Sequence, residues 1–453
     1  MVESTLAAAP PRPAERTSAP VTLVIACASV LLVLIDYNAP LVTVPRIASA
    51  LGAGETGQTW VINGIVLGLA ATMLIMGSLA DDYGRRRVFV TGTLLFAVAC
   101  AAGGAVTGTV PFVLLRIAQG VGAAAMLTAS MGLIAHAYPA GPARIRATGL
   151  WGAMLGLGIA VGPLVSASLA TVWDWRAVYW IYAAFGLLIA AITPRLVPES
   201  RAEERHSLDV PGVATLAVGL TLLLTAVTEG RNGWGRPEVG LLFAGAAVAL
   251  AVFAAIELRR RAPMLDLRLF RRPEFIVATI GALVTGLAII GFMSYLPTVF
   301  QRTLHMSSLG SALPFTLWAG LSFLVSMQAR RLPGQARWQI AAGLVLAASG
   351  YAVMLGAVDA AAVGRLYAGF FVSGIGSGLL NAALARLAVE SVPAGRGSMG
   401  SGANQTARYL GSSTGVAFTV VLLGSASMNA GLLAVMATCL VGAVVAVAVR
   451  PGR

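Results

Sequence analysis

GSLADDYGRRRVF, at residues 77–89, is a short polar link between two long apolar runs, 57–79 and 88–107, and it indicates how the whole chain is built. A link of this length needs Gly84 for a tight reversal of the chain, and Asp81 can meet the positive N-terminal end of a neighbouring helix. The arginines at 85–87 would hold the link on the cytoplasmic side of a membrane. The alternative is a positively charged turn with no further role.

The composition excludes a soluble protein. Of the 453 residues, 58% are hydrophobic and only 11% are charged, whereas an ordinary soluble domain has about 25% charged residues. Lipid must therefore be the solvent for most of this chain. A bilayer core about 30 Å thick requires about 20 apolar residues per helix, and runs of that length recur along the sequence.

Fourteen apolar runs are long enough to cross a bilayer as helices, which predicts an all-α polytopic membrane protein. Strands are not expected, since the runs are too long and lack the alternation of an outer-membrane barrel. The predicted spans are 21–45, 57–79, 88–107, 110–137, 147–170, 176–195, 209–229, 237–257, 274–299, 307–328, 338–357, 363–386, 400–424 and 428–449.

The residue types exclude several kinds of site. All 31 positive charges are arginines, so a lysine-dependent P-loop or Schiff base is impossible. The three histidines and three cysteines lie far apart in the sequence, which indicates neither a zinc site nor a disulfide framework. We therefore expect no metal, no cofactor and no enzymatic activity.

The net charge of +13 indicates membrane orientation and not nucleic-acid binding, because the arginines form short clusters between the apolar runs. With a cytoplasmic N-terminus, 23 arginines lie on the cytoplasmic face and six on the opposite face, while Arg116 and Arg408 fall inside predicted helices. This distribution predicts that both termini are cytoplasmic. Residues 1–20 are rich in alanine and proline and are expected to form a disordered cytoplasmic tail.

Two long polar stretches, 197–208 and 258–273, divide the spans into three groups. A weak internal repeat agrees with this division, since RIAQGVGAA at 116–124 is similar to FFVSGIGSG at 370–378. Repeated halves are typical of secondary transporters, whose substrate site lies near the midplane of the membrane. The predicted groups are an N-terminal six-helix bundle at 21–195, an inserted helix pair at 209–257 and a C-terminal six-helix bundle at 274–449.

The link at 77–89 resembles the G-x3-D-[RK]-x-G-[RK]-[RK] signature of the major facilitator superfamily. The matching residues are Gly77, Asp81, Gly84, Arg85 and Arg86. Asp82 departs from the signature, which has Arg or Lys at that position. This departure concerns how strongly the link holds its neighbouring helices, and not the resemblance to the family.

Two further stretches resemble signatures of the same family. LLRIAQGVGAA at 114–124 is similar to its R-x2-Q-G-x-G pattern. GLGIAVGPLVSA at 156–167 is similar to its antiporter pattern through Gly158, Gly162 and Pro163, although Ser166 and Ala167 replace a final glycine pair. Both replacements are small, so close approach of the helices is preserved.

LLVLIDYNAPLVTVPRI at 31–47 and GSGANQTARYLGSSTGVA at 400–417 resemble the fourteen-helix drug:proton antiporter branch of that family, and the resemblance covers nearly the whole chain. It implies the major facilitator fold, with two six-helix bundles and two extra helices. The implied function is multidrug efflux, namely export of hydrophobic drugs, antibiotics or natural products by alternating access across a bacterial inner membrane. Protons would be the coupling ion. The alternative is a lipid or metabolite translocator, or an importer, of the same fold.

Asp36 is the one carboxylate that falls well inside a predicted span, and a carboxylate in lipid is costly and therefore a functional candidate. Arg116 cannot release its proton and needs an anion or a polar cavity. We predict that the two residues form a proton-coupling pair facing the central cavity, where removal from water favours the neutral carboxyl and the guanidinium favours the carboxylate. The alternatives are a static structural ion pair, or an Asp36 that caps an unwound stretch before Pro40.

Arg408, with Asn404 and Gln405 one turn earlier, forms a polar stripe at helical spacing. Arg408 can contact an anionic group of the substrate or extend toward the cytoplasm. Since one carboxylate faces two arginines, a divalent cation is disfavoured, and we expect a monomer that carries neutral, zwitterionic or monocationic hydrophobic compounds. The aromatic candidates for the cavity wall, each of which can instead pack in the core, are Tyr37, Trp60, Trp151, Phe292, Tyr295 and Trp318.

Overall fold

The computed structural model contains helices and no strand in the part of the chain that it describes, which confirms the predicted all-α class. The described residues are 13–202, 209–230, 233–260, 263–306, 308–329, 332, 335–425 and 427–449. The α-helices are α1 (Pro13–Asn38), α2 (Pro40–Leu51), α3 (Glu55–Tyr83), α4 (Arg85–Ala105), α5 (Thr109–Ala137), α6 (Pro142–Val172), α7 (Trp175–Leu196), α8 (Val210–Gly230), α9 (Pro237–Arg259), α10 (Pro273–Val284), α11 (Phe292–Thr303), α12 (Ser308–Ala329), α13 (Ala336–Met354), α14 (Val363–Glu390), α15 (Gly397–Ser425) and α16 (Met428–Ala448).

Eleven stretches of the described chain are long and apolar enough to cross a bilayer. They are formed by α1, α3 to α9, the continuous stretch from α10 to α11, α14 and α16. The protein is therefore a multi-pass membrane protein. The helix α9 has the least buried apolar window, with 17% of it inside the protein, so most of its surface is available to lipid.

Three features differ from the predicted spans. The helix α1 begins at Pro13, so residues 13–20 are helical and do not form a disordered tail, while residues 1–12 lie outside the described part. The first span is divided at Ala39 into α1 and α2, because Pro40 has no N–H to continue the helical hydrogen bonding. The span at 274–299 contains a π-helical segment, Thr285–Gly291, between α10 and α11.

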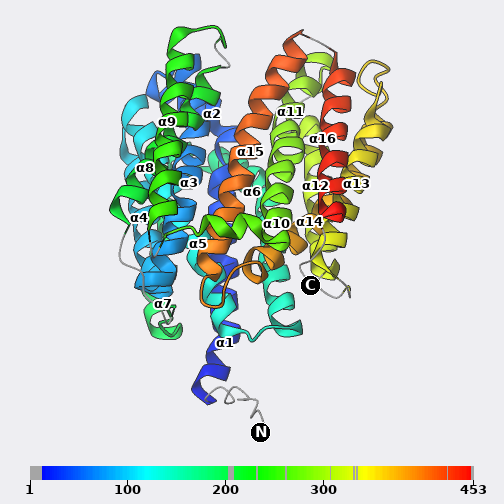
Figure 1. The fold of residues 1–453 in the computed structure, drawn as a ribbon. Helices are drawn as coiled ribbons and strands as arrows, with labels where there is room; N and C mark the ends of the chain where they lie inside the picture. The colour runs from blue at the N-terminus through cyan, green and yellow to red at the C-terminus, as the bar shows by residue number, and fades with distance from the viewer. Residues whose placement is uncertain are drawn as a thin grey trace.

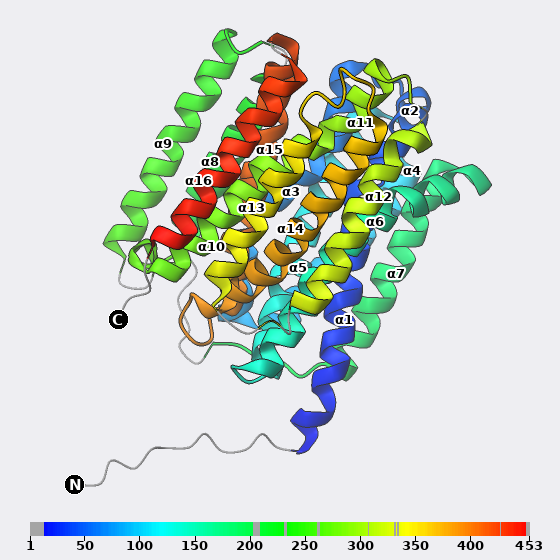
Figure 2. The same ribbon diagram turned by 90° about the vertical axis from the view of Figure 1, so that its right-hand side faces the viewer.

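Two groups of helices lie side by side, α1 to α7 in one half and α10 to α16 in the other (Figures 1 and 2). The halves meet where α3 packs along α15 and where α6 packs along α12 and α14. The helix α8 contacts α3 and α15, and α9 lies outside α8 (Figure 2). The inserted pair is therefore peripheral, and the contact between the halves belongs to the two bundles themselves.

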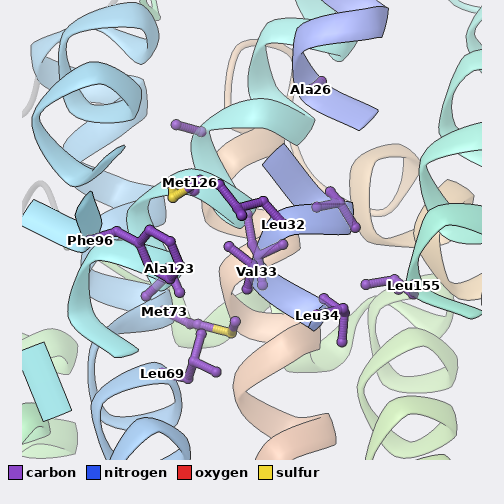
Figure 3. Packing of buried hydrophobic residues seen from close by; sticks show 14 of the residues in the cluster. Ala26, Leu32, Val33, Leu34, Leu69, Met73, Phe96, Ala123, Met126 and Leu155 are labelled. Atoms are coloured by element: carbon purple, nitrogen blue, oxygen red, sulfur yellow. The ribbon is translucent and has the colours of Figure 1, made fainter. Parts of the chain in front are cut away.

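The core of the N-terminal half is formed by apolar side chains from α1, α3, α4, α5 and α6 (Figure 3). Val33, Met73 and Phe96 are completely buried in it. Close packing of α3 on α5 depends on Gly68 and Gly120, because a Cβ atom at either position would overlap the backbone of the other helix.

Gly120→Ala is expected to destabilise the protein, because the added methyl group would overlap the Ile65 carbonyl oxygen and the Gly68 backbone. Overpacking of this kind costs about 1–3 kcal/mol, which should lower the midpoint of thermal unfolding of the purified protein in detergent. The matched control is Gly240→Ala on α9, where a Cβ has no heavy atom within 4 Å and alanine favours the helix. An unchanged midpoint for Gly120→Ala would contradict the close packing of α3 and α5.

Candidate functional site

Asp36 on α1 and Arg116 on α5 form an ion pair, with 2.9 Å between Asp36 Oδ1 and Arg116 Nη1. Both side chains are 0% exposed, so the predicted contact between them is present. A second hydrogen bond of 2.7 Å runs from Arg116 Nη1 to Gln119 Oε1, and Arg116 Nε donates to the Val61 carbonyl on α3 at 3.4 Å. The guanidinium is therefore held from α1, α3 and α5 at once.

The pair is buried among residues of the N-terminal half in this conformation, and its exposure to a central cavity stays a prediction. Gln119 Nε2 donates to the Ala99 carbonyl on α4, and the Arg116 guanidinium lies 6.0 Å from the centre of the Tyr179 ring on α7. All these neighbours belong to one bundle.

The second carboxylate oxygen of Asp36, Oδ2, is buried and receives no hydrogen bond from the described residues. The alternative in which Asp36 caps an unwound stretch is wrong, because α1 remains helical to Asn38 and α2 has Ala39 at its N-cap, with no side-chain hydrogen bond. Asp36 therefore combines a fixed partner at Oδ1 with an available acceptor at Oδ2.

The link between α3 and α4, in the N-terminal half, is hydrogen-bonded to the start of α15 in the C-terminal half. Asp81 Oδ2 accepts a hydrogen bond of 2.8 Å from the Met399 N–H, and Asp81 Oδ1 accepts one of 3.3 Å from the Ser398 N–H, both in the first turn of α15. Arg85 Nε binds Asp81 Oδ1 at 2.9 Å. The predicted meeting of Asp81 with a helix N-terminus is confirmed, and the helix dipole favours the carboxylate there.

Asp82, which departs from the family signature, adds an ionic contact between the halves. Its Oδ1 lies 2.8 Å from Nη1 of Arg396, just before α15. We call the set of Asp81, Asp82, Arg85 and Arg396, with the first turn of α15, the latch. The aspartate at position 82 therefore still forms an ion pair in the latch, because Arg396 supplies the opposite charge.

The other motif residues of the link also have defined contacts. Gly77 allows α3 to touch α15, since a Cβ there would overlap the Ser398 carbonyl, and Gly84 has a positive φ of 121° beside Glu199. Glu199 accepts a hydrogen bond of 3.0 Å from the Arg86 N–H. The sequence did not identify Glu199 or Arg396, because each is distant in sequence from the residue that it contacts.

The glycines of α6 bring that helix against α1. A Cβ on Gly158 would overlap Leu34, and one on Gly162 would lie 3.1 Å from the Asn38 Cβ. Pro163 lies inside α6, and Ser166, one of the two residues that replace the glycine pair, hydrogen-bonds with the Tyr182 hydroxyl at 2.8 Å. This motif therefore positions α6 beside the stretch of α1 that carries Asp36.

A small pocket with a few polar side chains lies between the halves. Its volume is about 10 Å³, so it is closed around space for about one water molecule. Four of the predicted cavity residues line it, namely Trp151, Asn404, Gln405 and Arg408. The full lining is Met131, Trp151, Leu155, Asn381, Leu384, Ala385, Ala388, Ser401, Asn404, Gln405 and Arg408.

Arg408 does not extend toward the cytoplasm, because it is only 6% exposed and its Nη2 donates a 2.8 Å hydrogen bond to Asn381 Oδ1 on α14. The sequence interpretation missed Asn381, although an amide in the middle of an apolar run is itself a signal of function in a membrane helix.

Most of the other aromatic candidates are not in this pocket. Tyr37 contacts Tyr409 across the halves, with 5.7 Å between ring centres. Trp60 instead donates to Glu229 Oε1 on α8 at 3.0 Å. Phe292 and Trp318 pack in the hydrophobic cluster of the C-terminal half, and the side chain of Tyr295 lies outside the described residues. The sequence alone does not distinguish an aromatic ring that packs in a core, such as Phe292 or Trp318, from one that lines a cavity.

Comparison with known proteins extends these observations. A profile of the Major Facilitator Superfamily matches residues 26–416. The chain is 30% identical over 424 residues to the cephamycin export protein CmcT of Amycolatopsis lactamdurans, a match covering 91% of this chain and 87% of that protein. It is 28% identical over 425 residues to the multidrug efflux pump LfrA of Mycolicibacterium smegmatis, covering 92% and 84%.

Two solved structures share the fold. The human organic anion transporter MFSD10 superimposes with a TM-score of 0.68 at 17% identity, over 96% of this chain and 100% of that one. The proton:xylose symporter XylE superimposes with a TM-score of 0.64 at 16% identity, over 96% and 94%. Since the profile spans most of the sequence and the helical halves agree with these structures, the chain belongs to the major facilitator superfamily.

Proposed function

We propose that this protein exports hydrophobic drugs, antibiotics or natural products in exchange for protons, by alternating access across a bacterial inner membrane. Its relatives named as a cephamycin exporter and a multidrug efflux pump support export of such compounds. The observation that carries proton coupling is the buried pair of Asp36 and Arg116, in which Asp36 Oδ2 receives no hydrogen bond from the described residues.

Asp36 is suited to bind and release a proton, because Oδ2 can take the proton while Oδ1 faces Arg116. Protonation would leave the guanidinium without its counter-charge, which is unfavourable in a buried site unless the surroundings rearrange. Tyr37 follows Asp36 directly in α1 and contacts Tyr409 of the other half. A rearrangement at Asp36 would therefore act directly on Tyr37, which contacts the other half.

The proton gradient is a sufficient energy source. One pH unit supplies about 1.4 kcal/mol per proton, and a membrane potential of about 100 mV supplies about 2.3 kcal/mol more per charge. No nucleotide is required for the cycle.

We propose fourteen membrane crossings. The helices α12, α13 and α15, with 22, 19 and 29 residues, are long enough at about 1.5 Å per residue to add three crossings to the eleven apolar stretches. An even number places both termini on one side, and the arginine clusters assign that side to the cytoplasm.

In this orientation the latch lies on the cytoplasmic side and holds the two halves together there. Opening toward the cytoplasm requires that Asp81 leave the first turn of α15 and that Asp82 separate from Arg396. The latch therefore sets the free-energy difference between the conformation seen here and a conformation open to the cytoplasm.

The proposed substrates are neutral, zwitterionic or monocationic. The central pocket is lined by one arginine and by no carboxylate among the described residues. A divalent cation in this pocket would meet a like charge in a medium of low dielectric constant, which disfavours its binding.

Asp36→Asn is expected to abolish export driven by a pH gradient, because asparagine keeps the size of the side chain but does not titrate. The measurement is the initial rate of dye accumulation in inside-out vesicles and in proteoliposomes under an imposed pH gradient. The matched control is Asp174→Asn, an N-cap that is largely exposed and whose capping role asparagine retains.

Retention of pH-driven export by Asp36→Asn at normal membrane abundance would contradict the assignment of the proton site. Movement of the dye out of inside-out vesicles by the wild type would indicate an importer instead.

A charge exchange tests the latch. Asp82→Arg and Arg396→Asp each place like charges together at a site that is mostly buried, and loss of a buried pair costs about 3–5 kcal/mol. We expect each single variant to reduce the initial rate of export at least tenfold, although Asp82→Arg restores the residue type of the family signature. The double variant Asp82→Arg/Arg396→Asp should recover much of the lost export rate. Export by the single variants at the rate of the wild type, or a double variant as poor as either single one, would contradict this role.

A further inference from the structure

Arg408 differs from the other buried arginines of the described chain. Arg85, Arg116, Arg396 and Arg408 are each at most 9% exposed. Three of them have a carboxylate partner, namely Asp81, Asp36 and Asp82. Among the residues that the structure describes, no carboxylate forms an ion pair with Arg408.

The Arg408 guanidinium is hydrogen-bonded to a neutral group, since Asn381 Oδ1 accepts from its Nη2 at 2.8 Å. Asn381 is itself held in place, because its Nδ2 donates to Ser322 Oγ on α12 at 3.1 Å. An amide oxygen orients the guanidinium but does not neutralise its charge. A buried cation without a counter-charge is costly, so the structure retains Arg408 at the expense of stability.

The position of Arg408 indicates what supplies the missing charge. The residue lines the pocket between the halves, together with Trp151 and Met131 from the N-terminal half. The planar guanidinium can donate two parallel hydrogen bonds to a carboxylate or sulfonate, and the apolar walls can contact a hydrophobic body. Since the pocket is closed to about 10 Å³, such a compound enters only when the halves separate.

We propose that Arg408, positioned by Asn381, binds an anionic group of the transported compound, so that the substrates are amphiphilic acids or zwitterions with a carboxylate or sulfonate. This inference rests on the proposed export function and revises its substrate class. It favours zwitterions over neutral and monocationic compounds and adds monoanions to the class.

The test compares rhodamine B, a zwitterion with a carboxylate, with its ethyl ester, a monocation of nearly the same shape. Binding of each dye to the full-length protein in lipid nanodiscs at neutral pH is measured by fluorescence anisotropy. A charge-assisted hydrogen bond is worth about 1.5–3 kcal/mol, so the wild type should bind the acid about 10- to 100-fold more tightly than the ester.

Arg408→Gln should lose this preference by weakening binding of the acid alone, and Arg408→Lys should keep part of it because the charge remains. The matched control, Arg259→Gln at the exposed end of α9, should bind both dyes like the wild type. Equal affinity of the wild type for the two dyes, binding of neither dye, or an equal loss for both dyes in Arg408→Gln would overturn the assignment.

Failure of the proposed function gives a different result. If the acid is bound selectively but a pH gradient does not move it in proteoliposomes, the binding site stands and proton-coupled export does not. If both dyes are exported equally, export stands and the anion site does not.

Discussion

A charge buried in a protein that is itself surrounded by lipid requires an opposite charge, because neither water nor the bilayer core can stabilise it. This constraint accounts for the main polar contacts of the structure. Asp36 meets Arg116 inside the N-terminal half, while Asp81 meets Arg85 and Asp82 meets Arg396 where the halves join. Arg408 is informative because it breaks the pattern at the place where a transported compound would lie.

The need to pair buried charges acts both within one bundle and between the two halves. The ion pair of Asp36 and Arg116 lies on α1 and α5 within one bundle, whereas the latch reaches from α3 to α15 across the molecule. Glycines bring the backbones close where these contacts form, as Gly77 does for α3 and α15 and Gly158 does for α6 and α1. The peripheral helices α8 and α9 contribute to neither ionic contact, and α8 packs on the bundles through α3 and α15.

Much of the fold could be predicted from the sequence, because apolar runs of bilayer length identify helices without knowledge of their neighbours. The contact between Asp36 and Arg116 could also be predicted, since each needs a buried partner and few are available. The contact of Asp82 with Arg396 could not, because the residues are 314 positions apart and only the docking of two bundles brings them together. For a related reason, the sequence alone left open whether the aromatic rings pack in a core or line a cavity. Trp60 and Phe292 both lie on apolar helices, and only packing decides that one binds Glu229 and the other lies in a core.

Asp36 and Arg116 form an ion pair within the N-terminal half, whereas Arg408 on α15 lines the pocket and is hydrogen-bonded to the neutral Asn381. Replacements on α14 and α15 can therefore alter which compound fits the pocket while the residues assigned to the proton remain intact. Under the proposed function, selectivity for a compound can therefore diverge within a lineage of exporters while the coupling ion is inherited unchanged.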